Sequence, residues 1–226
     1  MLSESDLKDA VFWACEQEVS APKPGNVNVI SDGHNMVVED FINSAHAIAP
    51  VMAKPDLTVG ERILQSIQAT RRVVNCNTNL GIVLLFAPLC QAVQSCETFD
   101  ELPERLQVVL NNLTVDDDID CYQAIRMAEA GGLGKKDQQD ISAVPTITFL
   151  EAMDLAKNRD QIAQQYINNF NTLWDLSLPS LTKALPKFSA VASRALSDSL
   201  KAALELSLPR PEGPGVPEGY LHIVPS

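Results

Sequence analysis

The residues best suited to chemistry stand directly in front of the most apolar stretch of the chain. Asn75, Asn77, Thr78 and Asn79 crowd together, and an apolar run follows from Leu80 to Leu89. A helix that is apolar on every side lies inside a globule. Its amino end presents free backbone N–H groups beside capping side chains, a combination that readily binds anions. The simpler alternative is a well-capped core helix without a ligand.

A second polar group lies near the amino end of the chain. The apolar stripe of the first predicted helix, formed by Leu7, Val11 and Ala14, continues by one turn to Glu18. A carboxylate at the end of a buried stripe is either solvated or held at the wall of a cleft, where it suits proton transfer. Lys23 follows in the stiff loop APKPG. It is either an ordinary surface lysine or a point charge that meets phosphate.

Further candidates come later in the chain. The glycines of the run GGLGKK let the backbone approach a ligand closely, and its lysines suit phosphate. The GxxxxGK[ST] spacing is absent, so this run is not a Walker loop. Glu151 and Asp154 share a helical face, although paired carboxylates on a surface helix are usually just solvated.

Helical periodicity predicts the elements that hold these residues. Pro88 is expected to kink or divide the apolar helix. No run with strand periodicity is present, so we predict an all-α fold, a multi-helix globule around a buried central helix over residues 1–207. A Pro/Gly-rich irregular tail follows at 208–226. The predicted helices are Ser3–Val19, Val38–Met52, Thr58 to about Val74, Leu80 to about Cys96, Leu102–Leu110, Asp116 to about Ala130, one starting at Pro145, a segment through Ile162 and Phe170, Asn171–Leu176 and Ala190–Leu206.

Composition narrows the class of protein. The net charge of −12 argues against a nucleic-acid partner, which needs a basic face. The apolar run is too short to span a membrane, so no membrane partner is expected. The five cysteines are scattered, without a CxxC pair, and the chain starts with an acidic amphipathic segment. Both features are typical of a cytoplasmic protein with reduced thiols, and a homo-oligomer is compatible with them.

Several segments taken together resemble one family. They stand in the expected order and cover roughly Glu18 to Phe170, about two thirds of the chain. The set resembles the triphosphoribosyl-dephospho-CoA synthase family, and more closely the branch found in archaea and one-carbon-metabolising bacteria. The segments are EVSAPKPGNVN, DGHNM with DFINSA, NTNLGIVLLFAPL, AIRMAEAGGLG and FLEAMDLAKNRDQIAQQY.

The resemblance implies an all-α transferase with ATP and dephospho-CoA as substrates. In this family ATP gives up adenine, and its triphosphoribosyl group passes to the 2′-hydroxyl of dephospho-CoA, which yields a prosthetic-group precursor. The chemistry needs a base near the acceptor hydroxyl, stabilisation of an oxocarbenium-like sugar, and cations on the triphosphate, with Mg²⁺ as the expected cofactor.

The resemblance also implies roles for individual residues. By its match to the family's E-x-x-x-x-KPG motif, Glu18 is a candidate base or metal ligand and Lys23 a phosphate contact that takes part in catalysis. The NTH motif of the family matches Asn77, Thr78 and Asn79, which are expected to bind phosphate or ribose, with Asn79 also catalytic. The remaining assignments are nucleotide binding by Gly131, Gly132, Gly134 and Arg159, and magnesium binding by Asp140, Glu151 and Asp154 together with Glu18.

The sequence departs from the family pattern at two places. Synthases typically read NTHKG where this chain reads NTNLG, so a histidine and a lysine are missing. The basic segment that typically ends members of the nearer branch is also missing from SDSLKAALELSLPRPEGPG. Two alternatives to the stated reaction therefore stay open. One is a related transferase for a pterin-type one-carbon carrier, and the other is a non-catalytic helical nucleotide-binding homologue.

Overall fold

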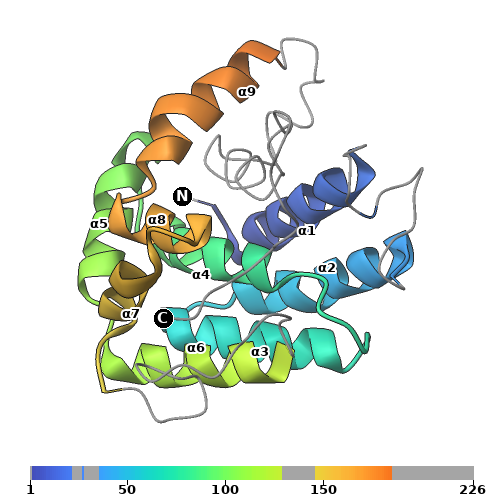
Figure 1. The fold of residues 1–226 in the computed structure, drawn as a ribbon. Helices are drawn as coiled ribbons and strands as arrows, with labels where there is room; N and C mark the ends of the chain where they lie inside the picture. Colours follow the sequence, from blue (N-terminus) through green and yellow to red (C-terminus); the bar gives the residue numbers. More distant parts are fainter. Residues whose placement is uncertain (1, 22–26, 28–35, 129–145, 185–226) are drawn as a thin grey trace, which may run out of the picture.

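The computed structural model describes residues 2–21, 27, 36–128 and 146–184 (Figure 1). Every regular element within these ranges is a helix, which confirms the all-α prediction. The predicted tail, 208–226, and the helix predicted at Ala190–Leu206 lie outside the described residues. The elements are α1 (Glu4–Ser20), α2 (Val38–Met52), α3 (Val59–Arg71), α4 (Leu80–Gln94), the 3₁₀ turn η1 (Phe99–Glu101), α5 (Leu102–Asn111), α6 (Val115–Ala128), α7 (Phe149–Ala156), α8 (Gln161–Ile167), the π-turn η2 (Leu173–Ser177) and α9 (Leu178–Ala184).

Capping side chains set where several helices begin. Ser3 caps α1 and Thr58 caps α3, both through a reciprocal capping box, and each helix begins within one residue of its expected start. The helix predicted to begin at Pro145 begins instead at Phe149, because the Thr148 side chain caps it. The carboxyl ends are less well predicted: α3 stops at Arg71, short of the expected Val74. The segment expected as a helix over 171–176 is helical and contains the π-helix η2, which leads into α9.

The apolar helix α4 is the centre of the fold. Eleven of its 15 residues are buried, which confirms the prediction of a buried central helix. Helices from both halves of the chain pack against it, among them α3, α5 and α8. Because α4 is surrounded by other helices, each of its two ends lies beside the ends of neighbouring helices.

Pro88 lies inside α4 and does not divide it, so the expected division is not observed, and the expected kink stays a prediction. Proline has no N–H, so the carbonyl of Leu84, four residues earlier, loses its usual helical partner. The Tyr166 hydroxyl of α8 donates to that carbonyl oxygen at 2.6 Å, in a fully buried position. A partner from a distant helix therefore satisfies the group that the proline leaves unpaired, and α4 continues through it.

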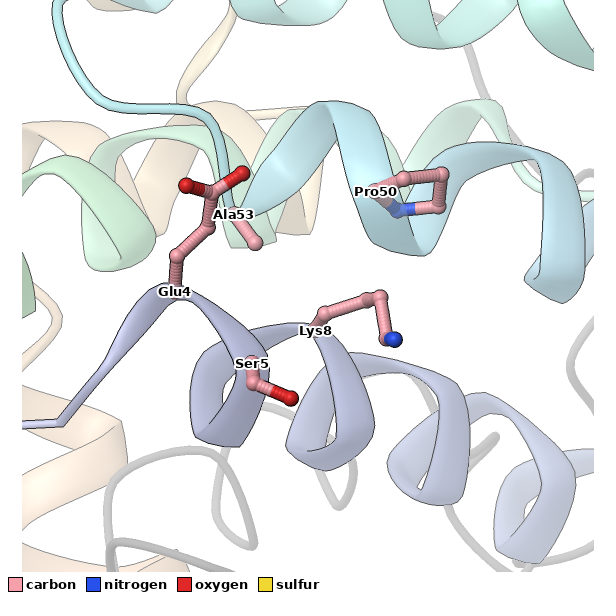
Figure 2. Close-up of a pocket in the computed structure, with 5 residues that line it drawn as sticks. All are labelled: Glu4, Ser5, Lys8, Pro50 and Ala53. Carbon is pink, nitrogen blue, oxygen red and sulfur yellow. The ribbon is translucent and has the colours of Figure 1, made fainter.

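The first two helices run antiparallel. Phe12 of α1 stacks on His46 of α2 with ring centroids 4.2 Å apart. Figure 2 shows an open hollow between the same helices, with Glu4 at the level of Ala53 and Lys8 at the level of Pro50. The residue numbers rise along α1 while they fall along α2, so the carboxyl end of α1 lies beside the amino end of α2.

A buried arginine ties three helix ends together at one end of the bundle. Arg62, in the first turn of α3, is fully buried and donates to the carbonyls of Met52, Lys54 (3.0 Å) and Leu57 (3.3 Å) and to Gln94 Oε1 (3.1 Å). These acceptors belong to the carboxyl end of α2, the turn after it and the carboxyl end of α4. The start of α3 and the ends of α2 and α4 therefore meet at this place.

Helices α3 and α6 run side by side in the same direction (Figure 1). The Gly60 N–H donates to Asp117 Oδ1 at 2.8 Å. A Cβ at Gly60 would lie 2.5 Å from the Asp117 Cα, so only glycine permits this approach. Since the two starts are paired, the carboxyl end of α6 lies at the same end of the bundle as the carboxyl end of α3.

Asp118 of α6 makes the stability of the fold depend on pH. It is fully buried, and neither carboxylate oxygen has a hydrogen-bond partner among the described residues. Burial raises its pKa from 3.8 to about 7. The folded state therefore holds this proton more tightly than the unfolded chain does. The stabilisation is fully present below about pH 4 and is lost as the pH rises toward 7.

Replacing Asp118 with asparagine should remove this pH dependence. Near pH 4, where the wild-type carboxyl is also neutral, the two proteins should have similar free energies of unfolding. At pH 8 the variant should be more stable by about 2 kcal/mol, after allowance for solvent screening. Urea unfolding at both pH values measures this difference, and an equal difference at both would contradict the buried-carboxyl explanation.

Candidate active site

Four helix ends converge at the end of the bundle away from Arg62. Ser44 of α2 lies 2.6 Å from Thr78, oxygen to oxygen, in a buried contact. Thr70, near the end of α3, accepts from Asn79 Nδ2 at 2.9 Å. These contacts join the amino half of α2, the carboxyl end of α3 and the turn before α4. The carboxyl end of α1 lies beside the amino end of α2, so it belongs to the same group, on the right of Figure 1.

The electrostatic environment of Cys76 indicates that the amino end of α2 and the carboxyl end of α3 lie close together. The pKa of the Cys76 thiol is raised by burial and further by Asp40, while Arg71 acts in the opposite direction. Asp40 belongs to the first turn of α2, and Arg71 ends α3. The loop from α3 to α4 therefore runs past both ends.

The amino end of α4 differs from the usual capped start. Asn79 is the N-cap residue, but its side chain makes no capping bond because Thr70 holds its amide. Asn77 Oδ1 accepts from the Leu80 N–H at 3.2 Å instead. Within the described residues, the N–H groups of Gly81 and Ile82 make no hydrogen bond, and both residues are partly exposed.

The electrostatics of this end suit an anion. The first turn of α4 contains no acidic residue, whereas α1, α2, α3 and α7 each place a carboxylate there that bonds the start of its own helix. Unpaired N–H groups and the positive end of the helix dipole attract negative charge. This helix start is therefore open to a ligand such as phosphate.

Glu18 lies at the carboxyl end of α1 and is only 7% exposed, so of the two alternatives that the sequence left open, a solvated or a buried carboxylate, the structure shows the buried one. Phe12 stacks on His46, so six residues later Glu18 lies at the level of Asp40 on antiparallel α2. The pKa of the neighbouring Cys15 thiol is raised by burial, then by Glu18 and by Cys90 of α4. Glu18 is thus a buried carboxylate at the end of the bundle that holds Asn77, Thr78 and Asn79.

Several predicted site residues cannot be compared with this geometry. They lie outside the described residues: Lys23, Gly131, Gly132, Gly134 and Asp140. The chain between Ala128 and the glycine run starts from the carboxyl end of α6, which lies at the same end of the bundle as the carboxyl end of α3.

The structure does not bring Glu151, Asp154 and Arg159 together with the four helix ends. Glu151 is exposed and caps its own helix, where hydrogen bonds from the Thr148 backbone and side chain lower its pKa. Asp154 is also exposed and forms an ion pair with Lys157 at 2.6 Å. Arg159 lies between α7 and α8, and Figure 1 shows α7 on the opposite side of the molecule from the end of α1. Their roles in binding magnesium or nucleotide stay predictions.

Sequence reasoning missed Ser44 and Thr70. Both are buried, and each bonds a residue of the predicted anion-binding turn. The signal was present in the sequence, because each places a hydroxyl among apolar positions of its helix. Buried hydroxyls need partners, but periodicity alone does not say which ones.

Two further properties concern metal clusters and membrane spans. Across the described ranges, no group of three or more His, Cys, Asp or Glu side chains could hold a metal ion. No helix in the part of the chain that the structure describes is long and apolar enough to cross a membrane.

Comparison with known proteins identifies the family. The family model described as CitG, ATP:dephospho-CoA triphosphoribosyl transferase, matches residues 4–206. Neither a curated protein nor a solved structure matches the chain. The match spans most of the sequence and includes all four helix ends of the candidate site. The chain therefore belongs to the CitG family and is a transferase that uses ATP.

Proposed function

We propose that this transferase carries out its reaction where α1, α2, α3 and α4 meet. The observation that carries the proposal is the pairing of two features at one end of the bundle. One is the uncapped start of α4, which suits phosphate, and the other is Glu18, a buried carboxylate. A triphosphate donor requires an anion-binding group, and a hydroxyl acceptor requires a base.

The chemistry follows from the substrates of the family. The bond between the ribose C1′ of ATP and N9 of adenine breaks, and a bond forms between C1′ and the 2′ oxygen of dephospho-CoA. Adenine leaves with the bonding electron pair and takes up a proton, while the acceptor hydroxyl loses one. Positive charge develops on the sugar in between, as in other glycosyl transfers.

Each proposed role matches the environment of a residue. Glu18 accepts the proton of the acceptor hydroxyl, because it is a carboxylate shielded from bulk water. The N–H groups of Gly81 and Ile82 bind the triphosphate at the start of α4. Lys23, five residues after Glu18 in the sequence, is proposed to add a positive charge there.

We propose that Mg²⁺ arrives bound to ATP. Near the four helix ends the described residues provide the carboxylates of Glu18 and Asp40, and one Asp40 oxygen already accepts from the Val37 N–H at 3.0 Å. Mg²⁺ commonly binds through one or two carboxylates together with substrate phosphates and water. This donor set fits such an ion and is too small for a cage made of protein ligands alone. When bound, the ion would neutralise charge on the triphosphate.

The identity of the acceptor substrate depends on which branch of the family this chain belongs to. Leu80 stands where synthases typically have a lysine, and it is 1% exposed, packed in the core. The Leu80 side chain packs in the core, so we propose that other groups of this chain hold the phosphate. The difference leaves room for a related acceptor, such as the pterin-type carrier suggested by the archaeal and one-carbon branch.

An acceptor panel tests these proposals. The purified protein is incubated with ATP and Mg²⁺ and either dephospho-CoA or a pterin-type acceptor, and adenine and the coupled product are measured by mass spectrometry. We expect adenine release only with an acceptor, and loss of release when EDTA removes the metal. If ATP binds but neither acceptor yields adenine, the proposed reaction is overturned.

We also propose that the enzyme works in the cytoplasm. All five cysteines are free thiols, and four of them are buried. Unpaired thiols persist where the compartment is reducing. The homo-oligomer suggested by the sequence stays a prediction that light scattering can test.

A further inference from the structure

A chain of two hydrogen bonds connects the start of α4 to α2. The Ser44 hydroxyl donates to the backbone carbonyl of Asp40, with 2.6 Å between the oxygens. The same Ser44 oxygen lies 2.6 Å from the Thr78 hydroxyl oxygen. Ser44 is 1% exposed and Thr78 is 8% exposed, so water does not compete freely for these groups.

The direction of both bonds follows from a count of hydrogens. A carbonyl oxygen can only accept, so the single hydroxyl hydrogen of Ser44 points to Asp40. The contact between Ser44 and Thr78 then needs the hydrogen of Thr78, because two hydroxyl oxygens at 2.6 Å without a hydrogen between them would repel. Thr78 therefore donates to Ser44, and no hydrogen of its hydroxyl is left for a ligand.

This direction decides what Thr78 can recognise. Its oxygen retains a lone pair, so toward a ligand it acts as an acceptor only. Phosphate oxygens at neutral pH are also acceptors, so a hydroxyl whose hydrogen is committed gains nothing from them. Sugar hydroxyls carry a hydrogen and are the matching donors on the substrate.

We propose that Thr78 accepts a hydrogen bond from a ribose hydroxyl of ATP, and that Ser44 is the positioning residue that holds Thr78 in this acceptor state. The inference rests on the proposed location of the active site. Two binding tasks are therefore divided between neighbouring groups. Thr78 binds the ribose, and the N–H groups at the start of α4 bind the phosphates. Ser44 does not touch the substrate.

The test measures binding, because removal of a ribose hydroxyl also changes the reactivity of the glycosidic bond. Dissociation constants for ATP, 2′-deoxy-ATP and 3′-deoxy-ATP are determined by calorimetry with Mg²⁺ present. The wild type should bind one of the two deoxynucleotides roughly 2- to 10-fold more weakly than ATP, the range of one neutral hydrogen bond. Comparison of the two analogues shows whether the 2′- or the 3′-hydroxyl of the ribose donates the hydrogen bond.

Four variants connect that preference to the two residues. The quantity compared is the dissociation constant of the deoxynucleotide divided by that of ATP. Thr78→Val removes the hydrogen-bond acceptor with little change of shape and should bring this ratio close to one. Thr78→Ser keeps the hydroxyl and should restore the ratio. Ser44→Ala frees the Thr78 hydrogen and should lower the ratio. Ser66→Ala is the matched control, since Ser66 is a fully buried hydroxyl of α3 with no hydrogen-bond partner in the described chain, and its ratio should equal that of the wild type.

The outcomes separate this inference from the proposed function. A Thr78→Val variant that keeps the wild-type ratio would overturn the role of Thr78, even if adenine is released normally. A wild-type ratio in Ser44→Ala would overturn the positioning role of Ser44. Equal binding of all three nucleotides by the wild type would overturn the inference while leaving the reaction intact. Failure of the wild type to bind ATP would overturn the active site together with the inference.

Discussion

Replacing Glu18 with glutamine is expected to lower kcat for adenine release by about 10²- to 10⁴-fold, the usual contribution of a general base. Glutamine has nearly the same shape as glutamate but accepts a proton far less readily. Glu18 is 7% exposed, so water cannot simply take over its role. The affinity for ATP should change much less, since binding of the triphosphate depends on donors at the start of α4. A kcat assay combined with ATP calorimetry measures both effects.

Glu16 provides the matched control for this experiment. It lies on α1, two residues before Glu18, and is more exposed. Glu16→Gln changes the net charge by the same amount, so it reports any general effect of charge on the bundle. We expect its kcat to stay within about threefold of the wild type, the range of surface substitutions. A Glu18→Gln variant that is folded by circular dichroism and equally active would remove Glu18 from the mechanism.

Replacing Arg62 with methionine is expected to destabilise the fold by about 3–5 kcal/mol, because several hydrogen bonds to a charged donor, each worth roughly 1.5–3 kcal/mol, are lost together. The guanidinium is fully buried and donates to the carbonyls of Met52, Lys54 and Leu57. Methionine fills similar space but donates nothing, so several buried acceptors lose their partner. Such a loss is a large part of the total stability of a typical domain. Urea unfolding monitored by circular dichroism measures it.

Arg105→Met provides the control for the loss of a positive charge. Arg105 lies on α5 with its side chain 47% exposed, 3.6 Å from Glu101. Exposed ion pairs contribute about 0–1 kcal/mol, so this variant should unfold close to the wild type. Equal losses in the two arginine variants would contradict a specific role for Arg62. So would an Arg62→Met variant as stable as the wild type.

Local physical rules predicted much of the fold. The caps Ser3 and Thr58 lie where capping chemistry puts them. The apolar run from Leu80 is the buried central helix, because a helix without a polar side has nowhere else to go. Counting one more turn along an apolar stripe singled out Glu18, although it left open whether the carboxylate is solvated or buried, as it is here. In each case the cause lies within a few residues of its effect.

The features that sequence reasoning missed depend on contacts across the fold. Pro88 was expected to kink or divide α4, but the local sequence did not show that the Tyr166 hydroxyl, 82 residues beyond Leu84, bonds the carbonyl that the proline leaves unpaired. Arg62 finds its acceptors on three separate segments. Ser44 and Thr70 acquire roles only when α2 and α3 meet the turn before α4. Periodicity gives the face of a helix, but it does not give the helix that packs against it.

The bond from Tyr166 to the Leu84 carbonyl constrains how this chain and its relatives can diverge. A relative with an ordinary residue at position 88 regains the backbone N–H, and the tyrosine hydroxyl then has no carbonyl to serve. Conversely, loss of the hydroxyl alone strands a buried carbonyl. The two positions should therefore covary, and an alignment of the family should pair proline at 88 with tyrosine at 166. Phenylalanine at 166 should be confined to members without that proline.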